Sequence, residues 1–579
     1  MTTQESKVNT LPSGSNKEKA YLDTDSKIEH ADLDTKEHAD LDTKEHTAVT
    51  GALGSSELTY TAISDIGGIF DAVRTGFTSG TQRELSSRKH QLRQFLRGLR
   101  EEKKALLDAV YFDIRKARGE TELFEYKAVE YEIGMFLDNL ETWSQPDCNP
   151  LAMQQPAFLL SRGQVRKEPR GTVVVLGAWN FPIRILLLPV VGALAAGNTV
   201  VIKPSELSPH TAAVVERVIR YMDPSVIRVV QGGVEETTVL LKQSFDHFFY
   251  TGNGRVGKIV ARAAAEHLSG VTLELGGKSP AIVHADVADL APVATRIMWS
   301  KLSNAGQTCV GTDYLLVHRS LKDKLVPLLV EAAHAMFGHS PQKSLDFGRI
   351  VNSRSWKRIM RLLSATEGTF VRVTEDEADE ADLFVPPTIV DGVRFDDALM
   401  TEELFAPVLP IITYDTLGEA IEFVNQGDQP LALYVFASSQ SAEHVISHTR
   451  SGTAVVNDTF FHLASHSNPF GGVGPSGVGN YTGKYSFDTF SHQRYVLKRP
   501  LWFPSPGVDT VRMPPYSGKE NAWKQELGNR MVYPAPRSLR DSVWSKLFTF
   551  IPFWRVLAII PGFLAALLTA KPLIRSRKE

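Results

Sequence analysis

GTVVVLGAWNFP (residues 171–182) and ILLLPVVGALAAG (185–197) decide the fold of this chain. The first stretch is a β-branched run that ends in a glycine turn, and the second is an apolar run of helical length. The pattern repeats in NTVVIKPSE (198–206) and TAAVVERVIRYM (211–222), and IRVVQGG (227–233) begins a third unit. Short apolar strands that alternate with helices predict an α/β fold with a doubly wound parallel sheet. Because ligands of such sheets bind where the strands end, we expect site residues in the turns that follow the strands.

Composition limits what the protein can be. A chain of 579 residues, 43% hydrophobic and 22% charged, can bury a large core and should divide into two or more domains. The net charge of -3 gives no basic surplus, so we expect no nucleic-acid partner. Cys148 and Cys309 are the only cysteines, which excludes a disulfide framework and a cysteine-rich metal site and favours a reducing compartment. We therefore expect Cys309 to be a free thiol and the protein to hold no metal.

The N-terminal stretch, residues 1–60, is polar and repetitive. EHADLDTK occurs twice, at 29–36 and 37–44, with one leucine in each unit. Such a repeat cannot bury enough apolar surface to offset the entropy lost on ordering, so we predict a disordered tail. Its histidines could bind a metal, but a solvated tail is the more common meaning of such a composition.

The C-terminal stretch is apolar. Residues 547–570, LFTFIPFWRVLAIIPGFLAALLTA, contain one charge, Arg555, and basic residues follow. A bilayer-spanning helix needs about 20 mainly apolar residues. We predict that residues 546–579 attach the protein to a membrane, either by spanning it or by lying in its interface. Pro552 and Pro561 interrupt the run, and a helix docked on the soluble body is the alternative.

The first candidate site is the turn TGNGRVGKIV (251–260). Gly252, Gly254 and Gly257 match a G-x-G-x-x-G pattern between a predicted strand and a predicted helix. That arrangement exposes backbone N–H groups at a helix N-terminus to a pyrophosphate, although a purely structural glycine turn fits the same residues. The pattern alone would make Glu274, about 20 residues further on, a ribose ligand.

Two other motifs carry groups for covalent chemistry. VTLELGGKSP (271–280) puts Glu274 at the end of a strand, where burial should raise its pKa as a general base requires, unless it is an exposed turn residue. NAGQTCVG (304–311) puts Cys309 in a small polar turn. A cysteine there could be a partly exposed nucleophile in electropositive surroundings, although most free cysteines are buried as small apolar groups.

Taken together, the motifs resemble the aldehyde dehydrogenase superfamily. They occur in the order GAWNFP (177–182), KPSE (203–206), TGNGRVG (251–257), LELGGKSP (273–280), NAGQTC (304–309), EELFAPV (402–408) and NPFGGVGPSG (468–477). NDTFFH (457–462) and NYTGKYSFDTFSHQR (480–494) are most similar to the class 3 branch, and a class 3-like body with a hydrophobic tail resembles the fatty aldehyde dehydrogenases.

This resemblance implies a domain organisation. It gives a Rossmann-type NAD-binding domain over 61–273 and an α/β catalytic domain over 274–465. Residues 466–500 would return to the NAD-binding and oligomerisation region, and 501–545 would form a C-terminal extension. A small β element, with a hairpin at about 159–171 and a strand at 495–500, would support a homodimer.

The resemblance also implies catalytic roles. Cys309 would attack the aldehyde carbonyl as a thiolate and form a thiohemiacetal. Its oxyanion would be held by the side-chain amide of Asn180 and the backbone N–H of Cys309. Loss of a hydride to the nicotinamide would leave a thioester, and Glu274 would activate the water that hydrolyses it.

For the cofactor, the resemblance implies that Lys203 and Glu206 hold the adenine ribose, which releases Glu274 from that role. The turn at the pyrophosphate comprises Gly252, Asn253, Gly254, Arg255, Val256 and Gly257. Relatives usually have serine at position 253. Glu403 would bind the nicotinamide ribose and Phe405 would pack near the ring. A carboxylate at Glu206 disfavours a 2′-phosphate, so we expect NAD, with NADP possible.

The substrate is less constrained. Membrane attachment favours long-chain aliphatic aldehydes, and Tyr131, Phe136 and Trp299 could line an apolar tunnel or belong to the core. Apocarotenoid and aromatic aldehydes fit the same features. A coenzyme A-acylating relative is disfavoured by Glu274, and a catalytically silent NAD-binding scaffold by the complete set of catalytic groups. A basic-flanked tail fits the endoplasmic reticulum, the mitochondrial outer membrane, peroxisomes or lipid droplets.

Overall fold

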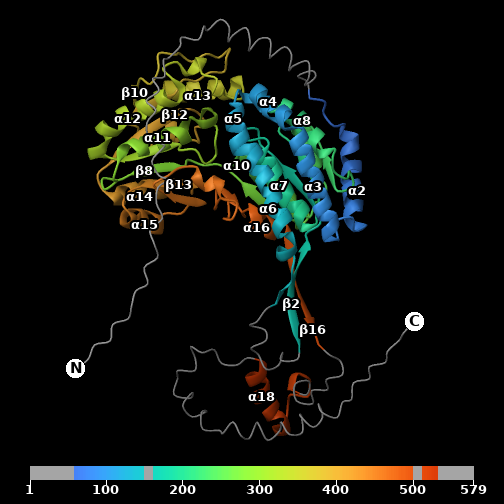
Figure 1. The fold of residues 1–579 in the computed structure, drawn as a ribbon. Coiled ribbons are helices and arrows are strands. Elements are labelled where there is room, and N and C mark those ends of the chain that lie inside the picture. Colours follow the sequence, from blue (N-terminus) through green and yellow to red (C-terminus); the bar gives the residue numbers. More distant parts are fainter. Residues whose placement is uncertain (1–57, 149–160, 500–510, 533–579) are drawn as a thin grey trace, which may run out of the picture. The chain divides into compact units, whose positions relative to one another are not determined.

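The computed structural model describes residues 58–148, 161–499 and 511–532 (Figure 1). The predicted tail 1–60 falls almost entirely outside the described residues, and the apolar segment 547–570 falls wholly outside them. Within the described ranges, no helix is long and apolar enough to cross a membrane.

A helical layer begins the described chain. Its elements are α2 (Ile63–Thr78), α3 (Leu85–Glu101), α4 (Lys103–Ile114), α5 (Arg118–Thr121), the π-helical turn η1 (Glu122–Tyr126) and α6 (Lys127–Trp143). Helix α6 packs against α3 and against α7 (Arg184–Ala196), whose residues are all buried. A helix that is apolar on all sides needs such cover.

A six-stranded sheet carries the predicted strands 171–182, 198–206 and 227–233. Its strands are β3 (Thr172–Leu176), β4 (Thr199–Lys203), β5 (Ile227–Val229), β6 (His247–Thr251), β7 (Gly270–Glu274) and β15 (Gly477–Val478). The order is β15-β7-β6-β3-β4-β5, and all neighbours are parallel except β15 on β7. Strands β4 and β5 follow β3 on one side, and the chain then crosses to place β6 on the other side of β3. The strand order therefore reverses between β3 and β6, and doubly wound sheets bind ligands at such a reversal. The predicted doubly wound α/β fold is confirmed.

The connections of this sheet are α7, α8 (Pro209–Ile219), α9 (Val234–Leu240) and α10 (Gly254–Glu266). Three strands, β3, β4 and β6, are buried at every residue. Burial on both faces explains their continuous apolar sequence.

A second sheet has seven strands in the order β10-β11-β12-β9-β8-β13-β14. They are β8 (Pro280–Val283), β9 (Tyr314–His318), β10 (Thr369–Val371), β11 (Thr388–Asp391), β12 (Val408–Tyr414), β13 (Ala432–Phe436) and β14 (Thr453–Val456). Its helices are α11 (Leu290–Leu302), α12 (Arg319–Phe337), α13 (Ser353–Ala365), α14 (Leu417–Gln426) and α15 (Ser439–His448). Only β10 runs antiparallel to its neighbour. A separate apolar core packs around this sheet.

A three-stranded sheet differs from the expected hairpin at 159–171. The described part of that stretch is one strand, β2 (Arg162–Pro169), which pairs with β1 (Asp147–Cys148) and with β16 (Ser491–Lys498) rather than with itself (Figure 1). The register with β16 runs from Ser491 opposite Pro169 to Lys498 opposite Arg162, which includes most of the expected partner strand 495–500.

Short elements complete the described chain. They are η4 (Ser303–Gly306), η5 (Pro341–Lys343), η6 (Ala398–Met400), η7 (Phe461–Ala464), α16 (Gly483–Thr489), η8 (Lys519–Asn521) and α18 (Ala522–Val532). The first of these ends three residues before Cys309.

Candidate active site

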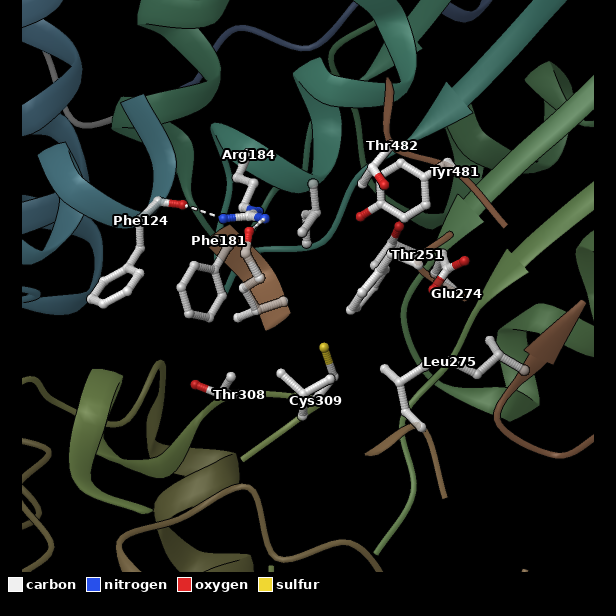
Figure 2. A pocket seen from close by; sticks show the side chains of 15 residues that line it. Phe124, Phe181, Arg184, Thr251, Glu274, Leu275, Thr308, Cys309, Tyr481 and Thr482 are labelled. Carbon is white, nitrogen blue, oxygen red and sulfur yellow. Dashed lines mark hydrogen bonds between the residues drawn. The ribbon is translucent and has the colours of Figure 1, made fainter. Parts of the chain in front are cut away.

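Cys309 and Glu274 line one cavity of about 570 Å³, a volume that includes the part open to solvent. Figure 2 shows the sulfur of Cys309 pointing into this space, with Glu274, Thr251 and Tyr481 across from it. Most of the wall is apolar, formed by Phe124, Phe181, Ile185, Leu275, Val310, Leu431, Leu463 and Phe470. Strand ends of the six-stranded sheet and loops that lead into the seven-stranded sheet therefore meet around one thiol and one carboxylate.

Glu274 is the last residue of β7, where the adjacent strand β15 places Gly477 opposite it. Its side chain is buried, and neither carboxylate oxygen has a hydrogen-bond partner among the residues that the structure describes. Burial raises the pKa of Glu274 well above its usual value. A raised pKa makes the ionised carboxylate a stronger base, so Glu274, once ionised, is suited to accept a proton from water, and the structure favours the buried alternative over the exposed turn residue.

The turn before Cys309 has an unusual backbone. Helix α11 ends at Leu302, and Asn304, Ala305 and Gly306 all have positive φ, at 50°, 53° and 75°. A Cβ on Gly306 would lie 2.2 Å from the carbonyl oxygen of Ala406. Glycine is therefore required by the positive φ and by the close approach of Ala406 and Pro407.

Gln307 fixes this turn from inside. Its amide nitrogen donates to the carbonyl oxygens of Asn304 (3.0 Å) and Arg349 (2.8 Å), and its amide oxygen accepts from the N–H of Val351 (2.9 Å). A buried amide with all these bonds holds the backbone two residues before Cys309 in one conformation.

The surroundings of Cys309 are not electropositive, so that expectation is wrong. The side chain is partly exposed, as predicted, but burial of the sulfur raises the pKa of the thiol to about 12, and the charges of Glu403 and Glu274 raise it further. The N–H groups of Val310 and Cys309 oppose this rise. Two carboxylates near the sulfur were not apparent from the local sequence, because Glu403 comes from a distant loop.

Asn180 reaches the nucleophile turn but not the cavity wall. Its side-chain amide donates to the backbone carbonyl oxygen of Gln307 at 3.1 Å. Its backbone carbonyl oxygen accepts from the side-chain amide of Asn304 at 2.9 Å. Its neighbours Phe181 and Arg184 line the cavity instead. Asn180 therefore contacts the backbone two residues before Cys309, and one of its two amide N–H groups is bound to the carbonyl oxygen of Gln307.

The residues predicted to bind the adenine ribose lie at the end of strand β4 and in the turn after it. Lys203 is its last residue, and its amino group contacts the carboxylate of Glu206 at 2.5 Å. Glu206 remains partly exposed, so its carboxylate is accessible to hydroxyl groups of a ligand.

The glycines of the 252–257 turn have different roles. A Cβ would collide with the Tyr250 hydroxyl group at Gly252 (2.2 Å) and with Leu275 at Gly257 (2.9 Å), but at Gly254 it would meet nothing within 4 Å. Asn253 caps α10 by accepting a hydrogen bond from the N–H of Val256 at 3.0 Å, and Arg255 follows in the first turn. Protein packing therefore explains Gly252 and Gly257 and leaves the space at Gly254 open for the approach of a ligand.

Glu403 lies close enough to Cys309 for its charge to act on the thiol, and Phe405 follows two residues later. A Cβ on Gly276 would lie 2.2 Å from a carboxylate oxygen of Glu403, and the N–H of Gly277 donates to this carboxylate. Burial raises the pKa of Glu403 to about 8. The ring of Phe405 packs edge-on against Trp179 with centroids 5.6 Å apart. The open space at Gly254, at the N-terminal end of α10, and the accessible carboxylate of Glu206 fit a dinucleotide such as NAD.

Sequence reasoning missed several residues of the cavity. Tyr481 is buried opposite Cys309, and its pKa is raised by burial and by the charge of Glu274. Arg184 is buried in the wall and donates to the carbonyl oxygens of Phe124 (3.0 Å) and Leu463 (2.7 Å). Tyr481 stands in a quoted motif, but Phe124 lies in the π-helical turn η1, which had no sequence signal.

The three aromatic residues proposed for a tunnel do not line this cavity. Phe136 is fully buried in the core against Trp143, and Tyr131 is largely exposed beside His466. Trp299 contacts Phe124, which does line the cavity, with ring centroids 5.9 Å apart. The helical positions of these residues could not show which side of each helix faces the site.

Comparison with known proteins decides the family. The family model for the aldehyde dehydrogenase family matches residues 56–496. The chain belongs to the aldehyde dehydrogenase family. It is an oxidoreductase that oxidises aldehydes with NAD, and solved members with this fold include complexes with NAD+.

The class 3 resemblance is also confirmed. The chain is 44% identical to aldehyde dehydrogenase family 3 member B1 of Bos taurus over 77% of this chain and 93% of the relative. It is 40% identical to 4,4'-diaponeurosporen-aldehyde dehydrogenase of Staphylococcus aureus, over 76% of this chain and 95% of the relative. The substrate-bound structure of Staphylococcus aureus AldH superposes with a TM-score of 0.75 at 38% identity, covering 80% of this chain and 99% of that chain.

Proposed function

We propose that this aldehyde dehydrogenase oxidises long-chain aliphatic aldehydes to carboxylic acids. The observation that carries the proposal is the nearly continuous apolar wall around Cys309, with rings from Phe124, Phe181 and Phe470. An alkyl chain gains about 0.8 kcal/mol for each methylene group that it buries, so such a wall favours long substrates over short ones.

In the proposed mechanism, Cys309 attacks the aldehyde carbon as a thiolate. The oxyanion would accept hydrogen bonds from the backbone N–H of Cys309 and from the second amide N–H of Asn180, which would have to turn towards the cavity from its place beside Gln307. NAD, which Lys203, Glu206 and Glu403 would hold, would supply the hydride acceptor, and the thiohemiacetal carbon on Cys309 would become that of a thioester. Glu274 removes a proton from a water molecule as its oxygen attacks the thioester, and the Cys309 thiolate leaves as the acid forms.

Cofactor residues have proposed roles in the same site. Lys203 and Glu206 hold the adenine ribose, the turn 252–257 approaches the pyrophosphate, and Glu403 binds the nicotinamide ribose. The carboxylate of Glu206 disfavours a 2′-phosphate, which makes NAD the preferred cofactor over NADP.

We further propose that residues 547–570 attach the protein to a membrane and that the protein forms a homodimer. An apolar segment with a basic flank supports attachment, which would bring the enzyme to aldehydes dissolved in the bilayer. The three-stranded sheet supports dimerisation, because β16 is its edge strand and most of its side chains are exposed.

An apocarotenoid aldehyde is the second candidate substrate. The relative from Staphylococcus aureus is named for 4,4'-diaponeurosporen-aldehyde, and a polyene chain would fit the same apolar wall.

The test is NADH formation by detergent-solubilised protein with hexadecanal, octanal, an apocarotenal, benzaldehyde and acetaldehyde, with Cys309→Ala as the control. We expect kcat/KM to rise steeply with chain length and to vanish in the Cys309→Ala protein, which should still bind NAD. A preference for the apocarotenal or benzaldehyde would replace the proposed substrate, and turnover by Cys309→Ala would refute the nucleophile.

A further inference from the structure

Lys278 forms hydrogen bonds to the backbone of the segment that carries Glu403. The amino group of Lys278 donates to the carbonyl oxygens of Leu399 (2.8 Å) and Glu402 (3.0 Å). Lys278 belongs to the turn that follows β7, directly after Gly276 and Gly277, which contact the Glu403 carboxylate. One turn therefore contacts both the side chain of Glu403 and the backbone that precedes it.

Asp313 fastens the same segment from the other side. One of its oxygens accepts from Lys278 at 2.6 Å, and the other accepts from the N–H of Leu404 at 3.0 Å. The N–H of Asp313 donates to the carbonyl oxygen of Ser279 at 2.7 Å. Asp313 comes between Cys309 and strand β9, so this single carboxylate connects the nucleophile loop with the segment that carries Glu403.

Hydrogen bonds thus hold the backbone immediately before and immediately after Glu403, at the carbonyl of Glu402 and the N–H of Leu404. The ion pair is protected from solvent, since the side chains of Asp313 and Lys278 are 5% and 17% exposed. Arg358 adds contacts on the outer side, to the carbonyl oxygens of Glu403 and Leu404. A protected charged pair with further hydrogen bonds keeps one geometry.

We infer that Lys278 and Asp313 are positioning residues for hydride transfer: they set the place of Glu403 relative to Cys309. The inference rests on the proposed binding of the nicotinamide ribose by Glu403. If Glu403 shifts, the nicotinamide shifts with it, whereas the apolar wall that binds the aldehyde stays in place. A displacement of about 1 Å between reacting groups can cost about a hundredfold in rate.

The variants are Lys278→Met, Lys278→Arg and Asp313→Asn, with Lys322→Met as the matched control. Lys322 forms an ion pair with Asp391, on β11 of the seven-stranded sheet, at 2.7 Å, close to the 2.6 Å between Lys278 and Asp313. The partner of Lys322 lies outside the segment that carries Glu403. Each protein is first compared with the wild type by thermal unfolding with and without NAD.

The readouts are the single-turnover rate of NADH formation, its primary deuterium isotope effect with aldehyde deuterated at C1, and KM for the aldehyde. For Lys278→Met and Asp313→Asn we expect the rate to fall about 10- to 100-fold and the isotope effect to rise, with KM for the aldehyde unchanged within twofold. Lys278→Arg should recover part of the rate because it keeps the charge, and Lys322→Met should match the wild type. Wild-type rates and isotope effects in folded Lys278→Met and Asp313→Asn would overturn the inference.

A double variant separates positioning from general support of the fold. If Lys278 acts through Glu403, Lys278→Met should cost little more in a Glu403→Gln background. An undiminished loss in that background would overturn the inference while leaving the role of Glu403 intact. If Glu403→Gln alone changes neither NAD binding nor hydride transfer, the proposed role of Glu403 fails, and the inference fails with it.

Discussion

Cys309 and Glu274 face each other across one apolar cavity (Figure 2), although Glu274 ends strand β7 of one sheet and Cys309 lies in the loop before strand β9 of another. The charge of Glu274 contributes to the raised pKa of Cys309, after burial and the charge of Glu403. Because ionisation of either carboxyl group opposes formation of the thiolate, Cys309 is mainly a thiol. The proposed nucleophile and the proposed base therefore lie at one cavity, but Cys309 does not yet have the charge that the proposed reaction needs.

The first prediction concerns the reactivity of Cys309. With a pKa of about 12, its alkylation by iodoacetamide should rise about tenfold for each pH unit between pH 7 and 10, since only the thiolate reacts. Glu403→Gln should speed alkylation several-fold above pH 8, where the Glu403 carboxyl group is ionised in the wild type. The matched control is Glu402→Gln, which removes a carboxylate that pairs with Arg358 and Arg361. An alkylation rate that does not depend on pH over this range would contradict the prediction.

The second prediction concerns stability and the buried Glu274. Its pKa in the folded protein is raised above that in the unfolded chain, so the folded state binds the proton more tightly. Stability from this group is present below about pH 4.3 and is lost as the pH rises towards the folded pKa. The melting temperature of Glu274→Gln should therefore exceed that of the wild type increasingly between pH 5 and 8. A difference that is constant with pH would show that Glu274 is not protonated in the folded state.

The third prediction separates a glycine needed for folding from one needed for the cofactor. Gly306→Ala should lower the melting temperature, because its Cβ would collide with Ala406 and its φ is 75°, a strain of roughly 1–3 kcal/mol. Gly254→Ala should leave the melting temperature unchanged, since its Cβ has open space, but it should weaken NAD binding. Calorimetric titration with NAD measures the second effect. Unchanged affinity in Gly254→Ala would argue against approach of the cofactor to this turn.

The fourth prediction concerns the C-terminal segment. A protein truncated before Ser545 should lose membrane association but keep its melting temperature and its activity on octanal, because the catalytic groups all lie before that point. Sedimentation with membranes after a carbonate wash measures the association. If the truncated protein still pellets with membranes, residues 547–570 are not the attachment.

Much of the fold was predictable from the chain, for identifiable reasons. Strands β3 and β4 are buried on both faces, so their apolar runs are unbroken, and the glycine turns mark where they end. For Glu274 the sequence left a buried base and an exposed turn residue open, and the structure shows the buried residue with the raised pKa. These properties depend on residues close together in sequence.

The properties that failed depend on distant residues. The electropositive surroundings expected for Cys309 were wrong because Glu403, far away in the chain, lies beside it. The 159–171 hairpin was wrong because β2 pairs with β16 across more than 300 residues. Phe136 could not be excluded from the site because the helical pattern of α6 does not show which neighbour covers each side.

The most direct test of the central claim is the mass of Cys309 in Glu274→Gln protein after incubation with NAD and an equimolar mixture of hexadecanal, an apocarotenal, benzaldehyde and acetaldehyde. Without its general base the thioester should persist, so peptide mass spectrometry reports both the nucleophile and the preferred substrate. We predict one hexadecanoyl group on Cys309 and none on the Cys309→Ala, Glu274→Gln double variant. An adduct on another residue, or an acyl group from one of the other aldehydes in its place, would contradict the account.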